Sequence, residues 1–267
     1  MSATAPLVLI TGASSGIGQA LAARFAQSGW RLALLARRTA EVEAWAQAQG
    51  LALGLTSERW AVFAADVQQA DSLVAAGRAC IAALGVPDVV IANAGISVGM
   101  DTAIRADLDV MQDVMATNVM GVAHTFHPFL AAMRERGSGV LVGVASVAAI
   151  RGLPGHAAYC ASKAAVVAYC ESLRGETRGS GVQVVTLVPG YIATPLTAGN
   201  PYPMPFLMSA AAFADEAFAA IAARRSYRVI PWQMAVVAKL LRVLPNALFD
   251  RVLSGRGRKP RRSSPPS

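Results

Sequence analysis

Seven short runs of apolar residues recur along the first 230 residues, separated by longer segments with a different pattern. Within each run the apolar positions are continuous rather than alternating, which is typical of strands buried on both faces of a sheet. The runs cover residues 7–11, 31–36, 60–65, 88–92, 140–145, 182–188 and 227–230. They predict seven strands of one parallel sheet.

The segments between these runs are rich in alanine and carry apolar residues at helical spacing, as at 19–27, 110–136 and 157–178. Helices in these positions are the crossovers that parallel strands require. We therefore expect an α/β fold: a Rossmann-like, doubly wound, seven-stranded parallel sheet with helices on both faces. Residues 1–231 are expected to form this domain.

Two regions depart from the alternation. Residues 190–208 contain four prolines and predict a loop beyond the sixth strand. Residues 232–253 have apolar positions at helical spacing, and Pro245 is expected to split them into two helices. We expect 232–255 to be a helical extension of the same domain. Its apolar stripe, with Lys239, Arg242 and Arg251 as neighbours, permits contact with a membrane surface, but packing on the domain or a partner subunit is favoured.

Composition narrows the class of protein. The chain has 267 residues, of which 54% are hydrophobic and 15% charged, so it can bury a large core and is not a disordered protein. Cys80, Cys160 and Cys170 are too few for a disulfide framework or a cysteine-based zinc site. The longest apolar run, 140–150, is too short to span a membrane, and the first residues lack a basic segment. We expect a cytoplasmic protein.

The net charge of +8 does not indicate nucleic-acid binding once it is divided along the chain. Residues 256–267 hold five positive charges and no acidic residue, which leaves +3 for residues 1–255. The five are Arg256, Arg258, Lys259, Arg261 and Arg262. Charge blocks of this kind are usually solvated, so we expect a flexible basic tail.

A glycine-rich loop follows the first strand and opens the first helix. Such glycines let the backbone turn tightly beside a pyrophosphate, and a helix N-terminus adds free N–H groups and a positive dipole end. The spacing is Gly-x3-Gly-x-Gly, and a plain tight turn is the alternative. The predicted phosphate-binding residues are Gly12, Ser14, Ser15, Gly16, Ile17 and Gly18.

The end of the second strand indicates which dinucleotide would bind. An NAD site places an acidic residue there, against the ribose 2′-hydroxyl. This chain has Arg37 and Arg38 instead. Guanidinium groups suit a 2′-phosphate because they donate in a planar, bidentate arrangement. The sequence therefore favours NADP(H), although two arginines can also simply mark the exposed start of a helix.

A tyrosine and a lysine, Tyr159 and Lys163, stand one turn apart on a predicted helix. Tyrosine near its reference pKa of about 10 is a poor acid–base catalyst at neutral pH, and a nearby ammonium group lowers that pKa. Ser146 closes the fifth strand, at the edge where ligands bind in such sheets. Its hydroxyl is suited to hold a substrate oxygen.

Together these motifs resemble the short-chain dehydrogenase/reductase family, in its compact single-domain branch. The resemblance covers about residues 6–230 and rests on the order of its elements. These are TGASSGIG at 11–18, Asp66-Val67, Asn93-Ala94-Gly95, Asn118, Ser146, Tyr159 with Lys163, and Pro189-Gly190 followed by Thr194. Two departures are Ala92 where the family often has a further asparagine, and a stretch at 50–59 longer than the family needs.

The resemblance implies a role for each matching position. Tyr159 would be the general acid/base, Lys163 would lower its pKa and hold the nicotinamide ribose, and Ser146 would orient the substrate oxygen. Asn118 would anchor a water that links Lys163 to solvent. The remaining cofactor contacts would come from Arg37, Arg38, Asp66, Val67, Asn93, Ala94, Gly95, Pro189, Gly190, Ile192 and Thr194.

The function expected from this reading is an NADP-dependent oxidoreductase that interconverts a carbonyl and an alcohol on a small or medium apolar molecule. The alternative is a non-catalytic NADP-binding sensor or scaffold, for which the full catalytic set would be unnecessary. The resemblance also implies a homodimer or homotetramer. His124 and His127 lack further ligands for a metal, and Met204 with Phe206–Met208 either line an apolar pocket or cover the core.

Overall fold

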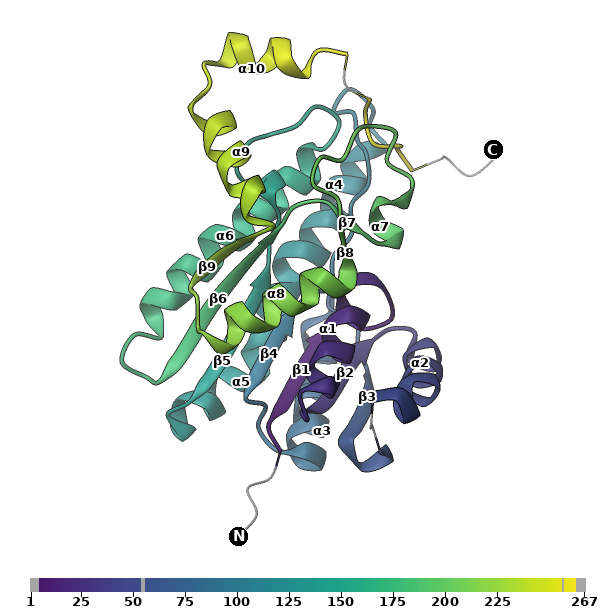
Figure 1. Cartoon of the computed structure of the whole chain (residues 1–267), viewed down its shortest axis with the longest axis vertical. Helices are drawn as coiled ribbons and strands as arrows, with labels where there is room; N and C mark the ends of the chain where they lie inside the picture. Colours follow the sequence, from purple (N-terminus) through teal and green to yellow (C-terminus); the bar gives the residue numbers. More distant parts are fainter. Residues whose placement is uncertain (1–4, 54–55, 256, 263–267) are drawn as a thin grey trace.

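The computed structural model describes residues 5–53, 56–255 and 257–262. Its centre is a seven-stranded parallel sheet in the order β3-β2-β1-β4-β5-β6-β9, as the sequence predicts (Figure 1). The strand order reverses between β1 and β4, which is the switch point where doubly wound sheets bind ligands. The strands are β1 Leu7–Thr11, β2 Arg31–Ala36, β3 Trp60–Ala64, β4 Val89–Ala92, β5 Gly139–Val144, β6 Val182–Pro189 and β9 Tyr227–Ile230.

The strands are apolar on both sides because helices cover both faces of the sheet. Along β1, Val8 and Ile10 join one core cluster while Leu7 and Leu9 join the other, and all four are fully buried. The first face is covered by α1 Gly16–Gln27, α2 Thr39–Leu53 and α8 Ala210–Ala222. The second is covered by α3 Ala70–Leu84, α5 Gly121–Arg136 and α6 Ala157–Glu176.

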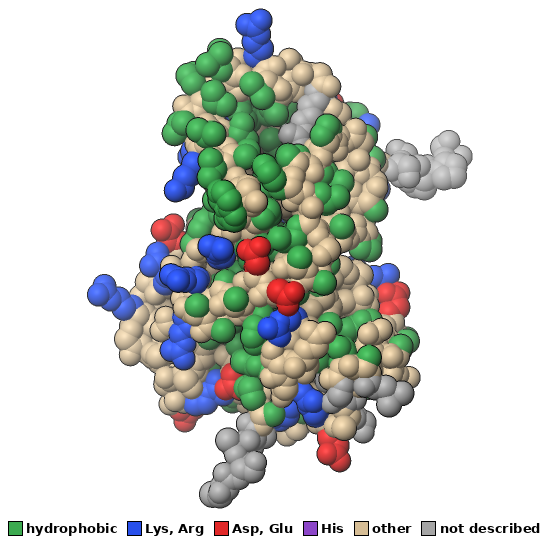
Figure 2. Space-filling model, viewed as in Figure 1, with side chains coloured by type: hydrophobic (Ala, Val, Ile, Leu, Met, Phe, Trp, Pro, Cys, Tyr) green, Lys and Arg blue, Asp and Glu red, His purple; other side chains and the backbone are tan. Residues whose placement is uncertain are grey.

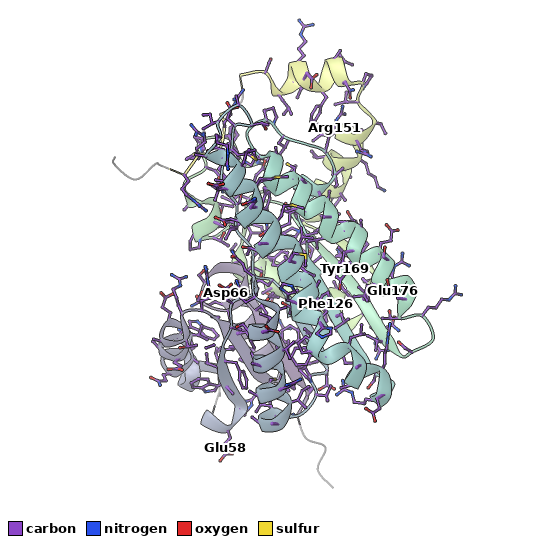
Figure 3. All side chains as sticks on the ribbon, turned by 180° about the vertical axis from the view of Figure 1, so that it is seen from behind. Glu58, Asp66, Phe126, Arg151, Tyr169 and Glu176 are labelled. Carbon is purple, nitrogen blue, oxygen red and sulfur yellow. The ribbon has the colours of Figure 1, made fainter. Side chains whose placement is uncertain are left out.

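The long helical segment predicted at 110–136 is not one uniform helix. It consists of α4 Asp107–Met115, a π-helical turn over Ala116–Met120, and α5. A π turn inserts an extra residue into the helical ladder and is frequent at functional sites. Here it contains Asn118. Beyond it, Phe126 of α5 stacks on Tyr169 of α6, which joins the two helices on this face (Figure 3).

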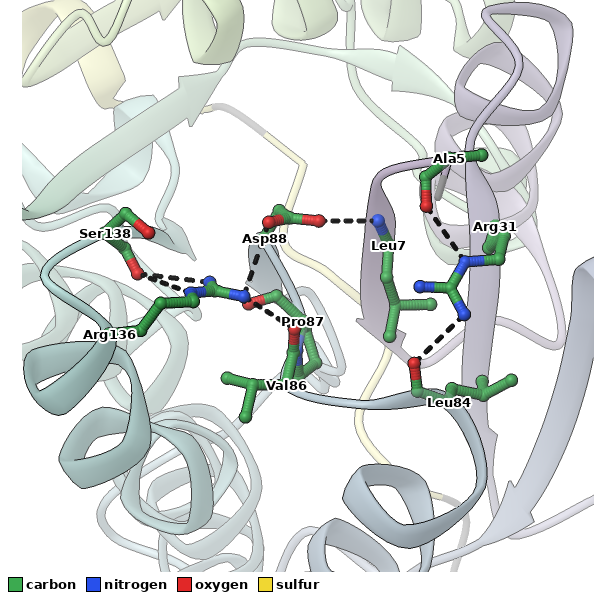
Figure 4. Close-up of polar contacts among 9 residues, drawn as sticks. All are labelled: Ala5, Leu7, Arg31, Leu84, Val86, Pro87, Asp88, Arg136 and Ser138. Atoms are coloured by element: carbon green, nitrogen blue, oxygen red, sulfur yellow. Dashed lines mark hydrogen bonds and ion pairs between the residues drawn. The ribbon is translucent and has the colours of Figure 1, made fainter. Parts of the chain in front are cut away.

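Polar clamps fix the amino-terminal edge of the sheet, opposite the edge that carries the predicted site (Figure 4). The Arg136 guanidinium donates to the carbonyls of Val86 and Pro87 at 2.8 and 2.7 Å. The Asp88 carboxylate accepts a bond of 2.8 Å from the Leu7 amide. Because these contacts fix where β1 and β4 begin, they also fix where both strands end.

The segment 190–208 is a loop that carries small elements which the sequence pattern did not predict. Two-residue strands, β7 Ile192–Ala193 and β8 Met208–Ser209, pair in parallel, and α7 Pro195–Ala198 lies between them. Elements of this length are too short to produce a periodic pattern. Single turns over Ser57–Arg59 and Val147–Ala149 complete the described elements. Part of the unexplained stretch at 50–59 is the last turn of α2, and residues 54–55 lie outside the described residues.

Two helices follow β9, with Pro245 between them: α9 Trp232–Val243 and α10 Asn246–Leu253. One face of α9 is buried against the domain through Met234 and Ala238. Arg151 fastens both helices, donating to the carbonyls of Leu241 and Leu244 and to Asn246 (Figure 3). One face of the helical extension therefore packs on the domain, which is one of the two arrangements that the sequence permits.

The outer face of the same helices is apolar and exposed. Hydrophobic side chains gather over α9 and α10 in Figure 2. They are Trp232, Val236, Leu240, Val243, Leu248 and Val252. Among the described helices, none is long and apolar enough to cross a membrane.

The described part of the basic tail, 257–262, is mostly exposed and makes polar contacts along the domain. The Gly99 amide donates to the Pro260 carbonyl at 3.0 Å, and Arg261 forms a bidentate pair with Asp107. Arg262 pairs with Asp113 at 2.8 Å. Acidic partners far away in the sequence hold the tail, so its own composition could not reveal this contact. We call residues 257–262 the C-terminal strap.

Candidate active site

The glycine-rich loop follows β1 and adopts the turn that its sequence predicts. Gly12 and Gly16 have φ angles of 68° and 58°, a region that favours glycine. A Cβ atom on Gly18 would stand 2.2 Å from the Gly12 carbonyl oxygen, so α1 approaches the loop closely only because that atom is absent. Ser15, the N-cap of α1, makes no side-chain capping bond. The first N–H groups of α1 are thus available to an anion.

This loop forms one wall of a cleft of about 450 Å³ at the carboxyl edge of the sheet. Most of the predicted cofactor residues line it: Gly12, Ser14, Ser15, Gly16, Ile17, Arg37, Arg38, Asp66, Val67, Asn93, Ala94, Gly95, Tyr159, Lys163, Pro189 and Thr194. Three predicted residues do not. Gly18 packs behind the loop, Ile192 lies in the core, and Gly190 lines a second pocket. The structure thus brings most of the predicted cofactor residues to one cleft.

Two arginines stand at the end of β2, where the cleft opens. Arg38 donates to the Ser14 hydroxyl at 3.3 Å and pairs with Glu41 at 3.1 Å. Arg37 is exposed and lines the cleft. Arg38 therefore contacts the phosphate loop through Ser14, and two guanidinium groups line this corner of the cleft.

Asn93 has a structural role that the sequence analysis did not anticipate. Its side-chain amide donates to the Thr11 carbonyl at 3.0 Å, and its backbone amide donates to the Thr11 hydroxyl at 3.1 Å. Thr11 itself is fully buried. These bonds tie the end of β4 to the start of the glycine loop, so Asn93 and Thr11 together set the depth of the cleft.

Asp66 follows β3 on the far wall of the same cleft (Figure 3). Its carboxylate accepts a bond of 3.1 Å from the Gln68 amide, which closes a local turn. The Gln68 side chain donates in turn to the Thr117 hydroxyl at 2.9 Å. Through this chain of bonds the π turn at 116–120 is connected to the wall of the cleft that carries Asp66.

Ser146, Tyr159 and Lys163 meet where β5 and α6 approach each other. Ser146 follows β5, and its hydroxyl accepts a bond of 3.2 Å from the Ala148 amide. Lys163 is buried and donates to the Val144 carbonyl at 2.8 Å. Its Nζ atom lies 5.8 Å from the centre of the Tyr159 ring. The structure thus brings the three predicted catalytic side chains together at one edge of the sheet.

Burial sets the direction of both pKa shifts in the pair. It raises the pKa of Tyr159, and hydrogen bonding to Ser146 offsets only part of that rise. Burial also lowers the pKa of Lys163 from 10.5 to about 8. The lysine ammonium donates to the Val144 carbonyl, and its effect on the pKa of the tyrosine stays a prediction.

Asn118 lies fully buried in the π turn, behind the predicted catalytic residues. It accepts a bond of 2.8 Å from the Ile96 amide and donates to the Ile96 carbonyl at 2.9 Å. It also donates at 3.0 Å to Ser162, whose hydroxyl donates at 2.8 Å to the Tyr159 carbonyl. Asn118 therefore connects the loop after β4 to the helix that carries Tyr159 and Lys163.

A second pocket, of about 150 Å³, adjoins the cleft, and Tyr159 and Leu196 line both. Its walls include apolar side chains of the loop after β5 and of α9: Val147, Ile150, Leu153, Met234, Val237 and Leu241. His156 and Tyr202 meet in it through a 2.9 Å bond. Of the loop residues proposed as a lining, Phe206 and Leu207 are instead about half exposed, at 49% and 48%.

Several pocket residues escaped the sequence analysis. Arg151 and Lys259 both line the second pocket, and both come from segments without a recognisable motif. Gly99, which lets the strap approach, was likewise missed, because its importance depends on a contact with Lys259. His156 carried a weak signal through its place at the start of α6. No set of three or more potential metal-ligating side chains occurs within residues 5–53, 56–255 and 257–262.

Comparison with known proteins identifies the family. The model of the family described as short chain dehydrogenase matches residues 6–202, which include the glycine loop, Asn118, Ser146, Tyr159 and Lys163. The chain belongs to the short-chain dehydrogenase/reductase family. Members of this family are oxidoreductases. The seven-stranded parallel sheet with helices on both faces, seen in this short-chain dehydrogenase/reductase, is the fold of the family.

Curated relatives support the same assignment. An uncharacterised oxidoreductase of Myxococcus xanthus is 41% identical over 242 residues, covering 91% of this chain and 94% of that protein. The dehydrogenase/reductase SDR family member 7B of Bos taurus is 31% identical over 96% of this chain and 83% of its own. The 2-(R)-hydroxypropyl-CoM dehydrogenase of Xanthobacter autotrophicus is 35% identical over 72% of this chain and 76% of its own.

Solved structures of family members contain either dinucleotide. A short-chain dehydrogenase of Sphingobium yanoikuyae in complex with NADPH superposes with a TM-score of 0.75 and 25% identity, over 91% of this chain and 97% of its own. One from Burkholderia phymatum in complex with NAD gives a TM-score of 0.79 and 25% identity, over 100% and 99% of the two chains. The fold of this short-chain dehydrogenase/reductase is therefore compatible with both cofactors.

Proposed function

We propose that this protein is an NADP-dependent oxidoreductase that interconverts a carbonyl and an alcohol on a small or medium apolar substrate. The observation that carries the proposal is the position of Tyr159, which lines both the dinucleotide-sized cleft and the smaller apolar pocket. A side chain at that junction can exchange a proton with a substrate oxygen in the pocket. The nicotinamide, when bound in the cleft, supplies or accepts the hydride.

The chain's own residues would divide the remaining work. The Ser146 hydroxyl, in the same pocket as Tyr159, would hold the substrate oxygen. Lys163, which is buried and donates to the Val144 carbonyl, would bind the ribose through its ammonium group. Asn118 would keep α6 in register with the loop after β4 through its bonds to Ile96 and Ser162.

The preference for NADP(H) rests on the corner of the cleft beside β2. Arg37 and Arg38 line it and would bind a 2′-phosphate through charge-assisted hydrogen bonds. Calorimetric titration of the wild type and Arg37→Ala with NADPH and NADH tests this. Tighter binding of NADPH that is lost in Arg37→Ala supports the assignment, whereas equal affinity for both cofactors contradicts it.

The apolar walls of the second pocket support an apolar substrate body. A screen of apolar ketones with NADPH, using Tyr159→Phe as the control, tests the activity. The alternative, a sensor or scaffold, predicts NADPH binding without turnover of any ketone. The proximity of Ser146, Tyr159 and Lys163, with Asn118 buried behind them, favours the enzyme, because binding alone does not need an acid–base group at the pocket.

We also propose a homodimer or homotetramer in the cytoplasm. Leu108 and Met120, on and beside α4, are exposed at 40% and 51%, which supports an interface near Asn118. Buried, unpaired Cys80, Cys160 and Cys170 are compatible with a reducing compartment. The molar mass of the wild type and of Met120→Glu, measured by light scattering, would test the interface.

The exposed apolar face of α9 and α10 supports a second, compatible proposal: contact with an anionic membrane surface. Trp232, Leu240 and Val243 are 60%, 60% and 77% exposed, and Lys239 and Arg242 are exposed on the same helix. Flotation of the full chain with vesicles containing anionic lipid, compared with Trp232→Gln, tests it. Recovery of both proteins in the vesicle-free fraction would leave packing between subunits as the role of this face.

A further inference from the structure

The C-terminal strap brings a lysine to the mouth of the substrate pocket. Lys259 lines the pocket together with Tyr159, Ser146 and Arg151. Its ammonium group donates at 2.9 Å to the carbonyl of Leu196, the residue that separates the pocket from the cleft. Lys259 thus stands in the pocket wall although it belongs to a tail that the sequence analysis expected to be solvated.

The strap is built to hold this position. A Cβ atom on Gly99 would lie 2.0 Å from the Lys259 carbonyl oxygen, so the strap reaches its place only beside a glycine. The neighbouring arginines each face an aspartate: Arg258 with Asp101, Arg261 with Asp107, and Arg262 with Asp113. These contacts lie on both sides of Lys259 in the sequence, and they fix the backbone from which its side chain enters the pocket.

Lys259 differs from these arginines in its partner. Its described contact is a backbone carbonyl, and the described residues that line the pocket include no aspartate or glutamate. Burial lowers the pKa of Lys259, because the ammonium loses water without gaining a carboxylate. Arg151, on the same pocket, also bonds to carbonyls and an amide rather than to an acid. Lys259 therefore brings a positive charge to a pocket whose described lining holds no carboxylate, while the Arg151 guanidinium is occupied by α9, Asn246 and the Phe249 ring.

Asn200 adds a polar group to the same wall. Its Oδ1 atom is buried and has no hydrogen-bond partner among the described residues. Its side-chain nitrogen contacts the Met204 sulfur at 3.5 Å. A ligand group that accepts hydrogen bonds would therefore have Lys259 as its donor near the Leu196 end of the pocket.

We propose that the substrate is an amphiphilic ketone or alcohol with an acidic group, and that Lys259 binds this group while the carbonyl or hydroxyl carbon lies at Tyr159. The shared chemistry is an anion, such as a carboxylate or a phosphate monoester, at one end of an apolar chain. The apolar walls formed by Val237 and Leu241 would contact that chain. This inference rests on the proposed function, and Lys259 is its specificity-determining residue.

The test compares three probes with NADPH present: a medium-chain methyl ketone with a terminal carboxylate, its methyl ester, and the analogue with a terminal phosphate. Wild-type protein is expected to bind and reduce at least one acidic probe about tenfold more efficiently than the ester, because only the acidic probes form a charge-assisted hydrogen bond with Lys259. The two acidic probes distinguish a carboxylate from a phosphate.

Lys259→Gln keeps a donor for the Leu196 carbonyl but removes the charge. It should raise KM and Kd for the acidic probe about tenfold and leave both values for the ester unchanged, whereas Lys259→Arg should restore much of the preference. Lys239→Gln, which removes an exposed lysine of α9 outside the pocket, is the matched control. It should leave the preference intact.

The outcomes separate this inference from the proposed function. Reduction of the ester and the acids with equal efficiency, unchanged in Lys259→Gln, would overturn the role of Lys259 and keep the oxidoreductase. Binding of an acidic probe that depends on Lys259, without turnover, would keep the anion site and contradict the oxidoreductase. Equal losses in Lys259→Gln and Lys239→Gln would show a general charge effect and overturn the site.

Discussion

Arg261 and Asp107 are 154 positions apart in the chain, yet the Arg261 Nη2 atom lies 3.0 Å from Oδ1 of Asp107. The Arg261 Nε atom bonds to the other carboxylate oxygen, which makes the pair bidentate. The carboxylate side chain is only 3% exposed and also accepts a bond of 2.7 Å from the Asp101 amide. The pair fixes the C-terminal strap to the start of α4.

Replacement of Arg261 by glutamine should release the strap without touching the pocket. Hydrogen exchange at residues 257–262 should become faster, and selectivity for an acidic ketone should fall to the level of Lys259→Gln. Arg262→Gln is the matched control, because its partner Asp113 is exposed and surface pairs contribute about 0–1 kcal/mol. Unchanged exchange in Arg261→Gln would show that the pair does not hold the strap.

Acid should release the same contact. Hydrogen bonding to Arg261 holds the pKa of Asp107 below its ordinary value of 3.8. The stabilisation is therefore complete above that value and is lost as the pH falls through the lowered pKa of the folded state. Exchange at 257–262 should rise in this acidic window in the wild type. In Asp107→Asn it should be fast already at neutral pH.

Replacement of Lys163 by methionine should abolish activity and raise stability. Burial lowers the pKa of Lys163 from 10.5 to about 8, so the unfolded chain binds more protons between these values and stability rises with pH across that window. At pH 7 Lys163→Met removes this unfavourable burial, and we expect a gain of about 1–3 kcal/mol in the free energy of unfolding.

Thermal unfolding without cofactor measures this gain, which should shrink as the pH approaches 10. Lys239→Met, at an exposed position of α9, controls for the change of side chain. A lower melting temperature for Lys163→Met at neutral pH would mean that the bond from Lys163 to the Val144 carbonyl outweighs the desolvation of the charge.

Alanine at Gly18 should damage the phosphate loop. The new Cβ atom would lie 2.2 Å from the Gly12 carbonyl oxygen and 2.9 Å from the Asn93 amide nitrogen. We expect a loss of about 1–3 kcal/mol in stability, as for other overpacked sites, together with weaker NADPH binding. Calorimetry and urea unfolding measure the two effects.

Gly175→Ala is the matched control for that substitution. Gly175 lies in α6 and a Cβ atom there would meet no other atom within 4 Å. The variant should be unchanged or more stable by roughly 0.5–1 kcal/mol, since alanine loses less entropy in a helix than glycine. Similar losses in both variants would mean that close packing at Gly18 is not what the loop requires.

The sequence was sufficient for the sheet and most of the cleft because these depend on local pattern. Continuous apolar runs predicted the strands to within a residue or two, and glycine spacing after β1 located the phosphate loop. The C-terminal strap could not be predicted in this way. Its position depends on the missing side chain of Gly99 and on a buried Asp107, neither of which gives a periodic signal.

The electrostatics of Tyr159 and Lys163 were also beyond the sequence. Spacing on a helix predicts that the two side chains lie near each other, and they do, but it gives neither their burial nor the carbonyl of Val144 that accepts from Lys163. Burial decides the direction of both pKa shifts. A ligand that accepts a hydrogen bond from the Lys163 ammonium would change the pKa of this lysine.

The central claim is that hydride passes from the nicotinamide to a substrate carbonyl carbon while Tyr159 supplies the proton. It is tested most directly with NADPH that carries deuterium at nicotinamide C4. Wild-type protein incubated with this cofactor and an apolar methyl ketone should give an alcohol labelled on its carbinol carbon. Tyr159→Phe should bind NADPH as tightly as the wild type does. It should form labelled alcohol at least about a hundredfold more slowly, as expected when a general acid is removed. NADPH binding by the wild type with no labelled alcohol from any ketone, neutral or acidic, would contradict the claim and favour the sensor.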